Sequence, residues 1–379
     1  MLTSLLRNGA GLFHGADFRV HQALGTGMAP TFLIYQCTVS CGSRCSFCSI
    51  WKLPVHNELS LEELDKIIAD PFWSKLRWVN LTGGEPFNRR DYAEVAGMLQ
   101  KNLPALEMIS TPTNGFAPRS IIKKTTRALE LLGGRTNLAI NVSIDNIGAK
   151  HDLSRGIPKG YEKCMASLQG LRELKASWDN LEVGTETVIT SANIDDLGHI
   201  YDTLRPMTDH VNFTPVVINE SEYYKEQDAS LGLTSKETGK MEAFFDRLRL
   251  EEPAYAYYWS KVLEIKKGQG RSFPCLGGYK TIYLDAHGNV YPCLVAPKHF
   301  HMGNAREDSV EALWMGSQGD MVRQRIKEYD FCGVCTNNCD IVNNLKEEML
   351  DFAAYMGTHP RVFSALVKQV GDGRLAKYV

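Results

Sequence analysis

Strand-like hydrophobic runs alternate with helical patterns between residues 31 and 217, and this alternation constrains the fold more than any other feature of the sequence. The strand candidates span residues 31–38, 76–83, 107–115, 137–145, 181–190 and 210–217. Apolar residues at helical spacing fill the gaps, beginning at residues 60–72, where Ser60 and Glu63 match a capping box. Alternating strands and helices indicate a parallel sheet with crossover helices. The sequence therefore predicts an α/β fold, a partial (β/α)6 barrel of the TIM type with fewer units than a closed barrel.

The chain on either side of this region has a different character. We expect an N-terminal extension over residues 1–30 before the partial barrel of 31–217, and a polar, Tyr-rich linker with helices over 218–267. Short strands, turns and cysteines then predict a small C-terminal α+β domain over 268–345. A C-terminal helix and tail occupy 346–379.

Composition excludes several classes of function. The formal net charge is -2 with scattered Lys and Arg, so we expect no nucleic-acid partner. No apolar run long enough to cross a membrane and no signal peptide are present, which predicts a cytoplasmic protein without a membrane span. In a reducing compartment, the ten cysteines are expected to be ligands rather than disulfides.

The stretch CTVSCGSRCSFCSIW follows the first predicted strand and places Cys41, Cys45 and Cys48 at the spacing CxxxCxxC. Thiolates at this spacing can converge on one centre, and such loops most often hold a metal. Half of a zinc site is the alternative interpretation, although no histidine lies at ligand spacing.

Unusual residues stand at the ends of the next predicted strands, where the loops of a barrel meet. They are Thr82, Gly83, Gly84 and Glu85 after the second strand, Asn114 after the third, and Ser143 and Asp145 at the fourth. Glycines next to a carboxylate allow close approach of a ligand ammonium group, and Arg155 could receive the matching carboxylate. The alternatives are an ordinary turn at GGEP, a surface ion pair between Arg155 and Asp152, and a core role for Ser143 and Asp145.

Together these residues resemble the radical S-adenosylmethionine (SAM) enzymes. The resemblance rests on CxxxCxxC with Phe47 before the last cysteine, on GGEP, and on SIDNIGAKHDLSRG, and it covers roughly residues 30 to 217. It implies a SAM-binding four-iron four-sulfur (4Fe-4S) cluster held by Cys41, Cys45 and Cys48, with one iron left open for SAM.

The same resemblance implies roles for the residues at the strand ends. Gly83, Gly84 and Glu85 would hold the SAM ammonium group, and Arg155 its carboxylate. Ser143 and Asp145 would serve the ribose and methionine region. Phe47, Thr82 and Asn114 are further expected cofactor-binding residues.

A second group of cysteines lies near the C-terminus: Cys275, Cys293, Cys332, Cys335 and Cys339, with Gly288 at a predicted hairpin turn between the first two. This pattern resembles the twitch or SPASM-like extension of radical SAM enzymes. Five thiols cannot complete two four-thiolate clusters, so one auxiliary 4Fe-4S cluster is expected. Cys275 and Cys293 are expected ligands, and of the other three we favour Cys332 and Cys335. A structural zinc site is the alternative.

Two cysteines lie outside these groups. Cys164 has Leu168 and Leu171 at helical spacing and is expected to be a buried small hydrophobic residue. Cys37, at the end of the first strand, is a candidate catalytic hydrogen donor if its thiol faces the barrel interior, and a packed strand-end residue otherwise.

The expected function is that of a radical SAM oxidoreductase that oxidises a small metabolite, such as a sugar or aminocyclitol, through the auxiliary cluster. Redox-neutral epimerisation and modification of a ribosomally made precursor peptide are alternatives, as is a non-catalytic iron-sulfur or zinc protein. The resemblance also implies an electron donor of the flavodoxin or ferredoxin type.

Overall fold

The computed structural model describes residues 10–221, 223, 228–296, 298–326, 328–337 and 349–371. The chain divides into two compact units. We call Gly27–Gly232 with Gly277–Ile326 the barrel unit, and Met1–Thr26 with Leu233–Leu276 and Lys327–Val379 the helical unit.

The barrel unit is built on one nine-stranded sheet with the order β6-β5-β4-β3-β2-β1-β7-β8-β9. Its first six strands are parallel throughout, which confirms the predicted partial (β/α)6 barrel. The strands are β1 (Phe32–Thr38), β2 (Trp78–Gly83), β3 (Met108–Thr113), β4 (Asn137–Ser143), β5 (Leu181–Ile189), β6 (His210–Pro215), β7 (Thr281–Leu284), β8 (Asn289–Tyr291) and β9 (Gly303–Asn304).

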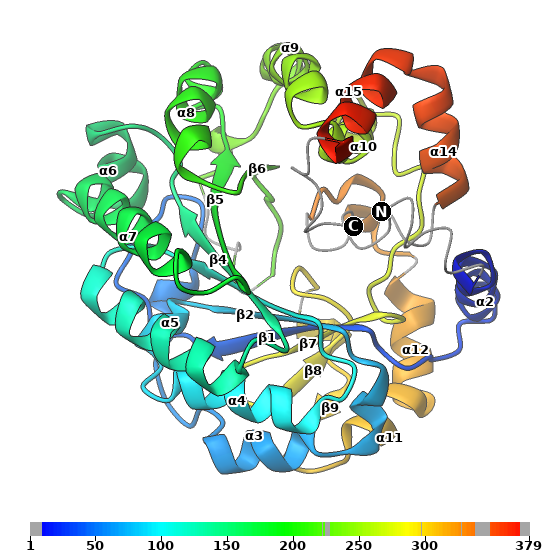
Figure 1. The fold of residues 1–379 in the computed structure, drawn as a ribbon. Helices are drawn as coiled ribbons and strands as arrows, with labels where there is room; N and C mark the ends of the chain where they lie inside the picture. The colour runs from blue at the N-terminus through cyan, green and yellow to red at the C-terminus, as the bar shows by residue number, and fades with distance from the viewer. Residues whose placement is uncertain are drawn as a thin grey trace. The chain divides into compact units, whose positions relative to one another are not determined.

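Crossover helices follow the parallel strands and cover the outer side of the sheet in Figure 1. The α-helices of this unit are α3 (Leu61–Ile68), α4 (Tyr92–Asn102), α5 (Pro118–Leu132), α6 (Ala149–Arg155), α7 (Gly160–Lys175), α8 (Leu197–Leu204), α11 (Val310–Met315) and α12 (Ser317–Ile326). Short 3-10 helices complete it: η1 (Ile50–Lys52), η2 (Pro71–Lys75), η3 (Pro86–Asn88), η4 (Arg205–Met207), η5 (Ala229–Leu231) and η7 (Lys298–Phe300).

Local sequence signals explain where these helices begin and end. The predicted capping box is present at α3, because Ser60 accepts from the Glu63 backbone N–H and Glu63 accepts from that of Ser60. Helix α5 starts with Pro118 and stops at Gly133, which has φ 54°. The apolar faces of the helices pack on the sheet, where strand residues such as Leu33 and Ile140 are fully buried.

The C-terminal hairpin continues the same sheet. Strand β7 pairs in parallel with β1, with Phe32 opposite Thr281 and Tyr35 opposite Leu284. Strand β8 then returns antiparallel to β7 through the predicted turn, where Gly288 has φ 89°. The sequence indicated short strands here, but it did not indicate that they extend the barrel sheet.

The helical unit contains α2 (Ala10–Leu24), α9 (Ser235–Glu251), η6 (Pro253–Tyr255), α10 (Ala256–Lys266), η8 (Asp330–Val334), α14 (Met349–Thr358) and α15 (Pro360–Gly371). Aromatic contacts hold its helices together. The rings of Phe245 and Trp259 stack with centroids 5.5 Å apart, and Tyr257 meets Phe352 edge to face. The predicted boundaries at residues 30, 217, 267 and 345 stay predictions.

The pairing of β5 with β4 and with the edge strand β6 depends on a glycine. Gly184 on β5 lies opposite Asn141 on β4 and His210 on β6, whose side chains form a 2.8 Å hydrogen bond across it. A Cβ atom at Gly184 would lie 2.2 Å from His210 Nε2 and 2.4 Å from Asn141 Oδ1.

We therefore expect Gly184→Ala to lower the free energy of unfolding by about 1–3 kcal/mol through overpacking. Gly239→Ala is the matched control, because nothing lies within 4 Å of the added Cβ in the middle of α9. The control should be stabilised by about 0.5–1 kcal/mol. Urea unfolding of both variants measures the difference, and equal stability of Gly184→Ala and wild type would contradict the packing argument.

Candidate functional site

The cysteine loop runs from the end of β1 to η1 and carries the three motif thiols. Cys45 is buried, whereas Cys41 and Cys48 are half-buried, and none of the three is in a disulfide. Burial raises the pKa of each thiol, that of Cys48 to about 12. Thiolates here therefore need a positive partner, such as the iron of a bound cluster.

Backbone hydrogen bonds fix this loop to two other segments. Arg44 N–H donates to Arg155 O over 2.9 Å, and Ser46 N–H donates to Ser154 O over 3.3 Å, both at the end of α6. On the other side, Ser49 N–H donates to Tyr223 O over 2.7 Å. The positions of the thiols are therefore set by the barrel rather than by the loop alone.

The donor set fits an iron-sulfur cluster better than a single ion. Among the residues that the structure describes, no three His, Cys, Asp or Glu side chains gather closely enough to hold one metal ion. A 4Fe-4S cluster does not require such convergence, because each thiolate binds a different iron of the cubane. Three soft thiol donors on one loop match this chemistry.

Arg155 connects the cysteine loop to β4. Its guanidinium binds both carboxylate oxygens of Asp145 with contacts of 2.5 and 2.9 Å, and its Nη1 lies 3.7 Å from Cys45 Sγ. It also lies over the ring of Phe47, 5.2 Å from the centroid. The alternative pairing with Asp152 is wrong, since that carboxylate accepts from two backbone N–H groups at the start of α7.

The GGEP turn packs against the start of the cysteine loop. Gly84 N–H donates to Thr38 O over 2.7 Å, and Glu85 N–H donates to Ser40 O over 2.8 Å. A Cβ at Gly84 would lie 2.3 Å from Ser40 O, and Gly83 has φ 134°. This close approach of two backbones, which an isolated ordinary turn does not require, explains both glycines.

The Glu85 carboxylate ties β2 to β3. It accepts from Thr113 Oγ1 over 2.9 Å, from Asn114 N–H over 2.7 Å and from Phe87 N–H over 3.1 Å. Burial raises the pKa of Glu85 to about 7, while these hydrogen bonds act in the opposite direction. Thr82 is buried beside the turn, and Asn114 Oδ1 accepts from the Phe116 N–H group.

Sequence reasoning missed polar residues on β5 and β6. Ser143 lies opposite Glu186, and Glu186 lies opposite Asn212, so the three share one face of the sheet. Thr214 Oγ1 donates to Glu186 Oε1 over 2.6 Å, and burial raises the pKa of Glu186 to about 7. The alternation of side chains along LEVGTETVIT would have placed Glu186 on this face.

Cys37 lies on the other face of β1 from its neighbour Gln36. The Gln36 side chain donates to Tyr223 Oη, whereas Arg89, from the connection between η3 and α4, donates to Cys37 O over 3.0 Å. The Cys37 thiol is fully buried, and burial raises its pKa to about 12. The strand-end packing alternative therefore fits the geometry, and the expected hydrogen-donor role does not. Cys164 on α7 is also fully buried, as predicted.

The C-terminal cysteines are distributed over both units. Cys275, Cys332 and Cys335 belong to the helical unit and Cys293 to the barrel unit, and none of the four is in a disulfide. Within the helical unit, Lys266 lies close enough to Cys335 for their charges to interact. Cys339 lies outside the described residues.

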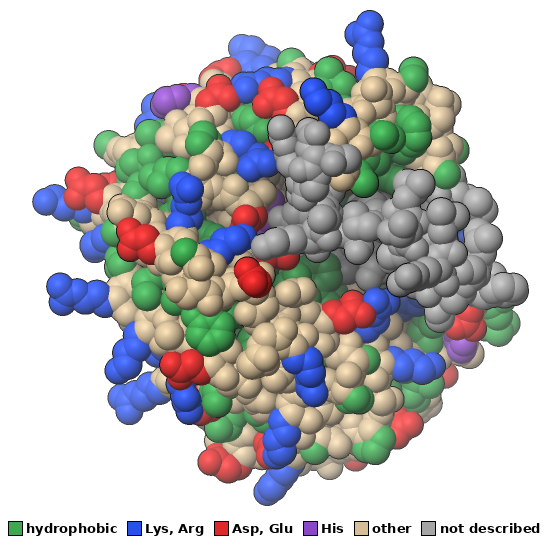
Figure 2. All heavy atoms as spheres, viewed as in Figure 1, with side chains coloured by type: hydrophobic (Ala, Val, Ile, Leu, Met, Phe, Trp, Pro, Cys, Tyr) green, Lys and Arg blue, Asp and Glu red, His purple; other side chains and the backbone are tan. Residues whose placement is uncertain are grey.

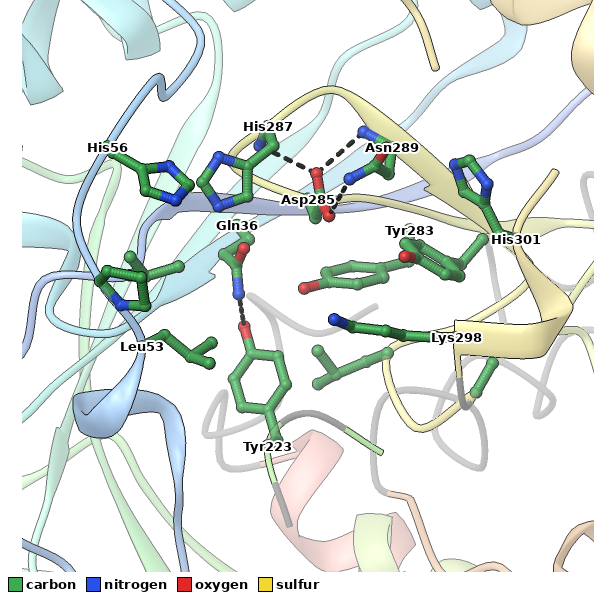
Figure 3. A pocket seen from close by; sticks show the side chains of 15 residues that line it. Gln36, Leu53, His56, Tyr223, Tyr283, Asp285, His287, Asn289, Lys298 and His301 are labelled. Carbon is green, nitrogen blue, oxygen red and sulfur yellow. Dashed lines mark hydrogen bonds between the residues drawn. The ribbon is translucent and has the colours of Figure 1, made fainter. Parts of the chain in front are cut away.

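A cavity of about 480 Å³ lies in the barrel unit next to the cysteine loop. Figure 3 shows side chains from β1, β7, β8 and the segment around Lys298 pointing into it. On the outside of the described residues, Figure 2 shows basic and acidic side chains intermixed over the face in view. Within the described residues, no helix has the length and apolar character needed to cross a membrane.

Comparisons with known proteins agree with this site. Residues 35–204 match the model of the radical SAM superfamily, and residues 275–340 match that of an iron-sulfur cluster-binding domain, SPASM. The AdoMet-dependent heme synthase of Methanosarcina barkeri is 22% identical over 330 residues, which cover 81% of this chain and 88% of that protein.

Other curated relatives match a shorter region. Molybdenum cofactor biosynthesis protein 1 of Drosophila melanogaster is 32% identical over 38% of this chain, and the GTP 3',8-cyclase of Caulobacter vibrioides is 33% identical over 36% of it. The matches span 24% and 38% of those two proteins.

Solved structures share the fold at low sequence identity. SuiB of Streptococcus suis, bound to SAM, superposes with a TM-score of 0.58 at 13% identity, covering 88% of this chain and 77% of SuiB. The enzyme anSMEcpe with bound AdoMet has a TM-score of 0.59 at 16% identity, covering 91% and 99%. The matched domains bring SAM, a 4Fe-4S cluster and an auxiliary iron-sulfur cluster as cofactors. Residues 35–204 therefore form a radical SAM domain, and residues 275–340 form a C-terminal SPASM-type iron-sulfur cluster-binding domain.

Proposed function

We propose that this enzyme is an oxidoreductase that removes hydrogen from a small metabolite and passes the second electron to its auxiliary cluster. The observation that carries the proposal is the cysteine loop, whose three thiols are fixed by backbone bonds at the carboxyl end of β1. Cys41, Cys45 and Cys48 would hold the SAM-binding cluster. When bound, this cluster and SAM supply a 5'-deoxyadenosyl radical, which takes hydrogen from an unactivated carbon.

The neighbouring strand ends would position SAM. The SAM ammonium group would meet the backbone of Gly83 and Gly84 and the carboxylate of Glu85. Thr82 and Asn114 would be further cofactor-binding residues nearby. Ser143 would face its ribose. The two backbone bonds between the glycine turn and the cysteine loop support this assignment, because they keep both binding elements at a fixed separation.

Arg155, held by Asp145, would orient both the SAM carboxylate and the cluster. Asp145 accepts from two N–H groups of the guanidinium, and Nη1 lies 3.7 Å from Cys45 Sγ. A buried cation next to a thiolate favours its charged form, and Phe47 shields the pair from water. Arg155 can therefore serve a bound carboxylate without leaving Asp145 unpaired.

Cys275, Cys293, Cys332 and Cys335 would hold one auxiliary 4Fe-4S cluster, with Cys339 as the alternative to one of the last two. Oxidation of an alcohol carbon then balances as one hydrogen atom lost to the radical, one proton lost to solvent, and one electron lost to the auxiliary cluster. A flavodoxin or ferredoxin type protein would supply the electron that starts each turnover.

Modification of a precursor peptide is the second candidate. It is favoured by the structural neighbours, since one structure of SuiB contains its precursor peptide SuiA and one of anSMEcpe contains a peptide. Epimerisation is less favoured, because the Cys37 thiol lies on the face of β1 away from Gln36 and the cavity.

Cys41→Ala should reduce 5'-deoxyadenosine formation from SAM to the level of a protein-free blank, because one of three cluster ligands is lost. Cys164→Ser is the matched control, since a hydroxyl can replace the buried thiol that donates to Asn114 O. The assay uses anaerobically reconstituted protein with dithionite. Normal cleavage by Cys41→Ala would refute the ligand assignment.

Cys293→Ala should leave SAM cleavage in place but uncouple it from product, because the substrate radical loses its electron acceptor. The ratio of oxidised product to 5'-deoxyadenosine, measured once a substrate is known, should fall from about one towards zero. Product formed at the wild-type ratio would show that the auxiliary cluster is not the acceptor.

A further inference from the structure

The described residues that line the cavity beside the cysteine loop all belong to the barrel unit. Its volume of about 480 Å³ lies in the range of pockets that hold a single small molecule. Gln36 and Val39 on one wall come from β1 and the start of the cysteine loop, and Tyr223 accepts through its backbone from Ser49, the residue after Cys48. A molecule in this cavity would therefore lie close to the chemistry of the loop.

Basic side chains outnumber acidic ones among the described residues that line the cavity. Lys298 extends into the space near Tyr223 and Tyr283, and His56 and His287 lie side by side across from it (Figure 3). His301, from the same segment as Lys298, has a buried Nε2 atom with no hydrogen-bond partner among the described residues. A buried nitrogen of this kind is costly unless a ligand or water satisfies it.

The carboxylate that lines the cavity already accepts hydrogen bonds within the protein. Asp285 is the one carboxylate among the described residues that line it. It accepts from the backbone N–H groups of His287 and Asn289 and from the Asn289 side chain, each over 2.8 Å, as Figure 3 shows. Because these bonds form the turn between β7 and β8, the Asp285 oxygens are engaged in stabilising the hairpin.

Aromatic and neutral groups line the rest of the space. Tyr283 and Tyr291 lie with their rings 5.9 Å apart, and Tyr223 is held by the hydrogen bond from Gln36 over 2.9 Å. Such a wall suits a compact molecule with both apolar and hydroxyl-bearing surface.

We propose that this cavity is the substrate site and that the substrate is a small molecule with a carboxylate or phosphate group, which Lys298 and His301 bind. The inference rests on the proposed function and narrows it. A cationic aminocyclitol would bring its positive charge to Lys298, so the geometry favours an anionic metabolite such as a sugar acid or sugar phosphate.

The test compares four probes on one carbon framework: glucose 6-phosphate, gluconate, glucose and glucosamine. Ligand-observed NMR on the anaerobically reconstituted full chain with SAM measures each dissociation constant. At least one of the two anions should bind about tenfold more tightly than glucose, and the comparison between them identifies phosphate or carboxylate as the preferred group. Glucosamine should bind most weakly.

Lys298→Gln and His301→Phe should each weaken binding of the preferred anion by about tenfold, and Lys298→Arg should restore most of it. Lys163→Gln, at an exposed lysine on α7, is the matched control and should bind like wild type. If His301→Phe fails to fold, the comparison of Lys298→Gln with Lys298→Arg still tests the proposal.

Three results would overturn the proposal: glucosamine or glucose binding as tightly as the anions, no binding of either anion, or anion binding unchanged in both Lys298→Gln and His301→Phe. Tighter binding of an acidic pentapeptide than of gluconate would show that the substrate is a peptide rather than a metabolite.

SAM cleavage by wild-type protein without probes is measured separately. Cleavage without anion binding refutes only the substrate class, whereas anion binding without cleavage refutes the proposed function.

Discussion

The contact between two backbones at the carboxyl ends of β1 and β2 is the constraint on which the rest of the site depends. Gly84 and Glu85 donate to carbonyl groups at Thr38 and Ser40, at distances that leave no room for a side chain at Gly84. The cysteine loop leaves β1 from this contact. Arg44 and Ser46 fix its middle to the end of α6, and Ser49 fixes its far end to Tyr223. The thiols are therefore pre-positioned by parallel strands rather than by a flexible connection.

Buried ionic groups then link successive strands at the same edge of the sheet. Glu85 joins β2 to β3, and Arg155 joins Asp145 to the cysteine loop. A buried carboxylate without a partner would be costly, so each of these groups is stable only because its donors are in place. The same arrangement creates a polar edge at the carboxyl ends of the strands, beside the cysteine loop.

Sequence periodicity was sufficient to predict the six parallel strands, because each strand and helix carries its own local signal. It could not reveal that β7 pairs with β1, since that pairing joins residues about 250 positions apart with no shared local pattern. Motif spacing located the three thiols and GGEP. The partner of Arg155 was missed because Asp152 is nearer in sequence, whereas folding brings Asp145 into contact. The face that Cys37 occupies also required the structure, because the strand end alone allows either side.

The central claim is that the chain holds two iron-sulfur clusters, one of them on Cys41, Cys45 and Cys48. Iron, sulfide and zinc content of the anaerobically reconstituted protein tests it most directly, for wild type and for the variant with all three cysteines changed to alanine. The account predicts about eight iron and eight sulfide per wild-type chain and about half of each in the variant. Equal iron in both proteins, or zinc in place of iron, would contradict it.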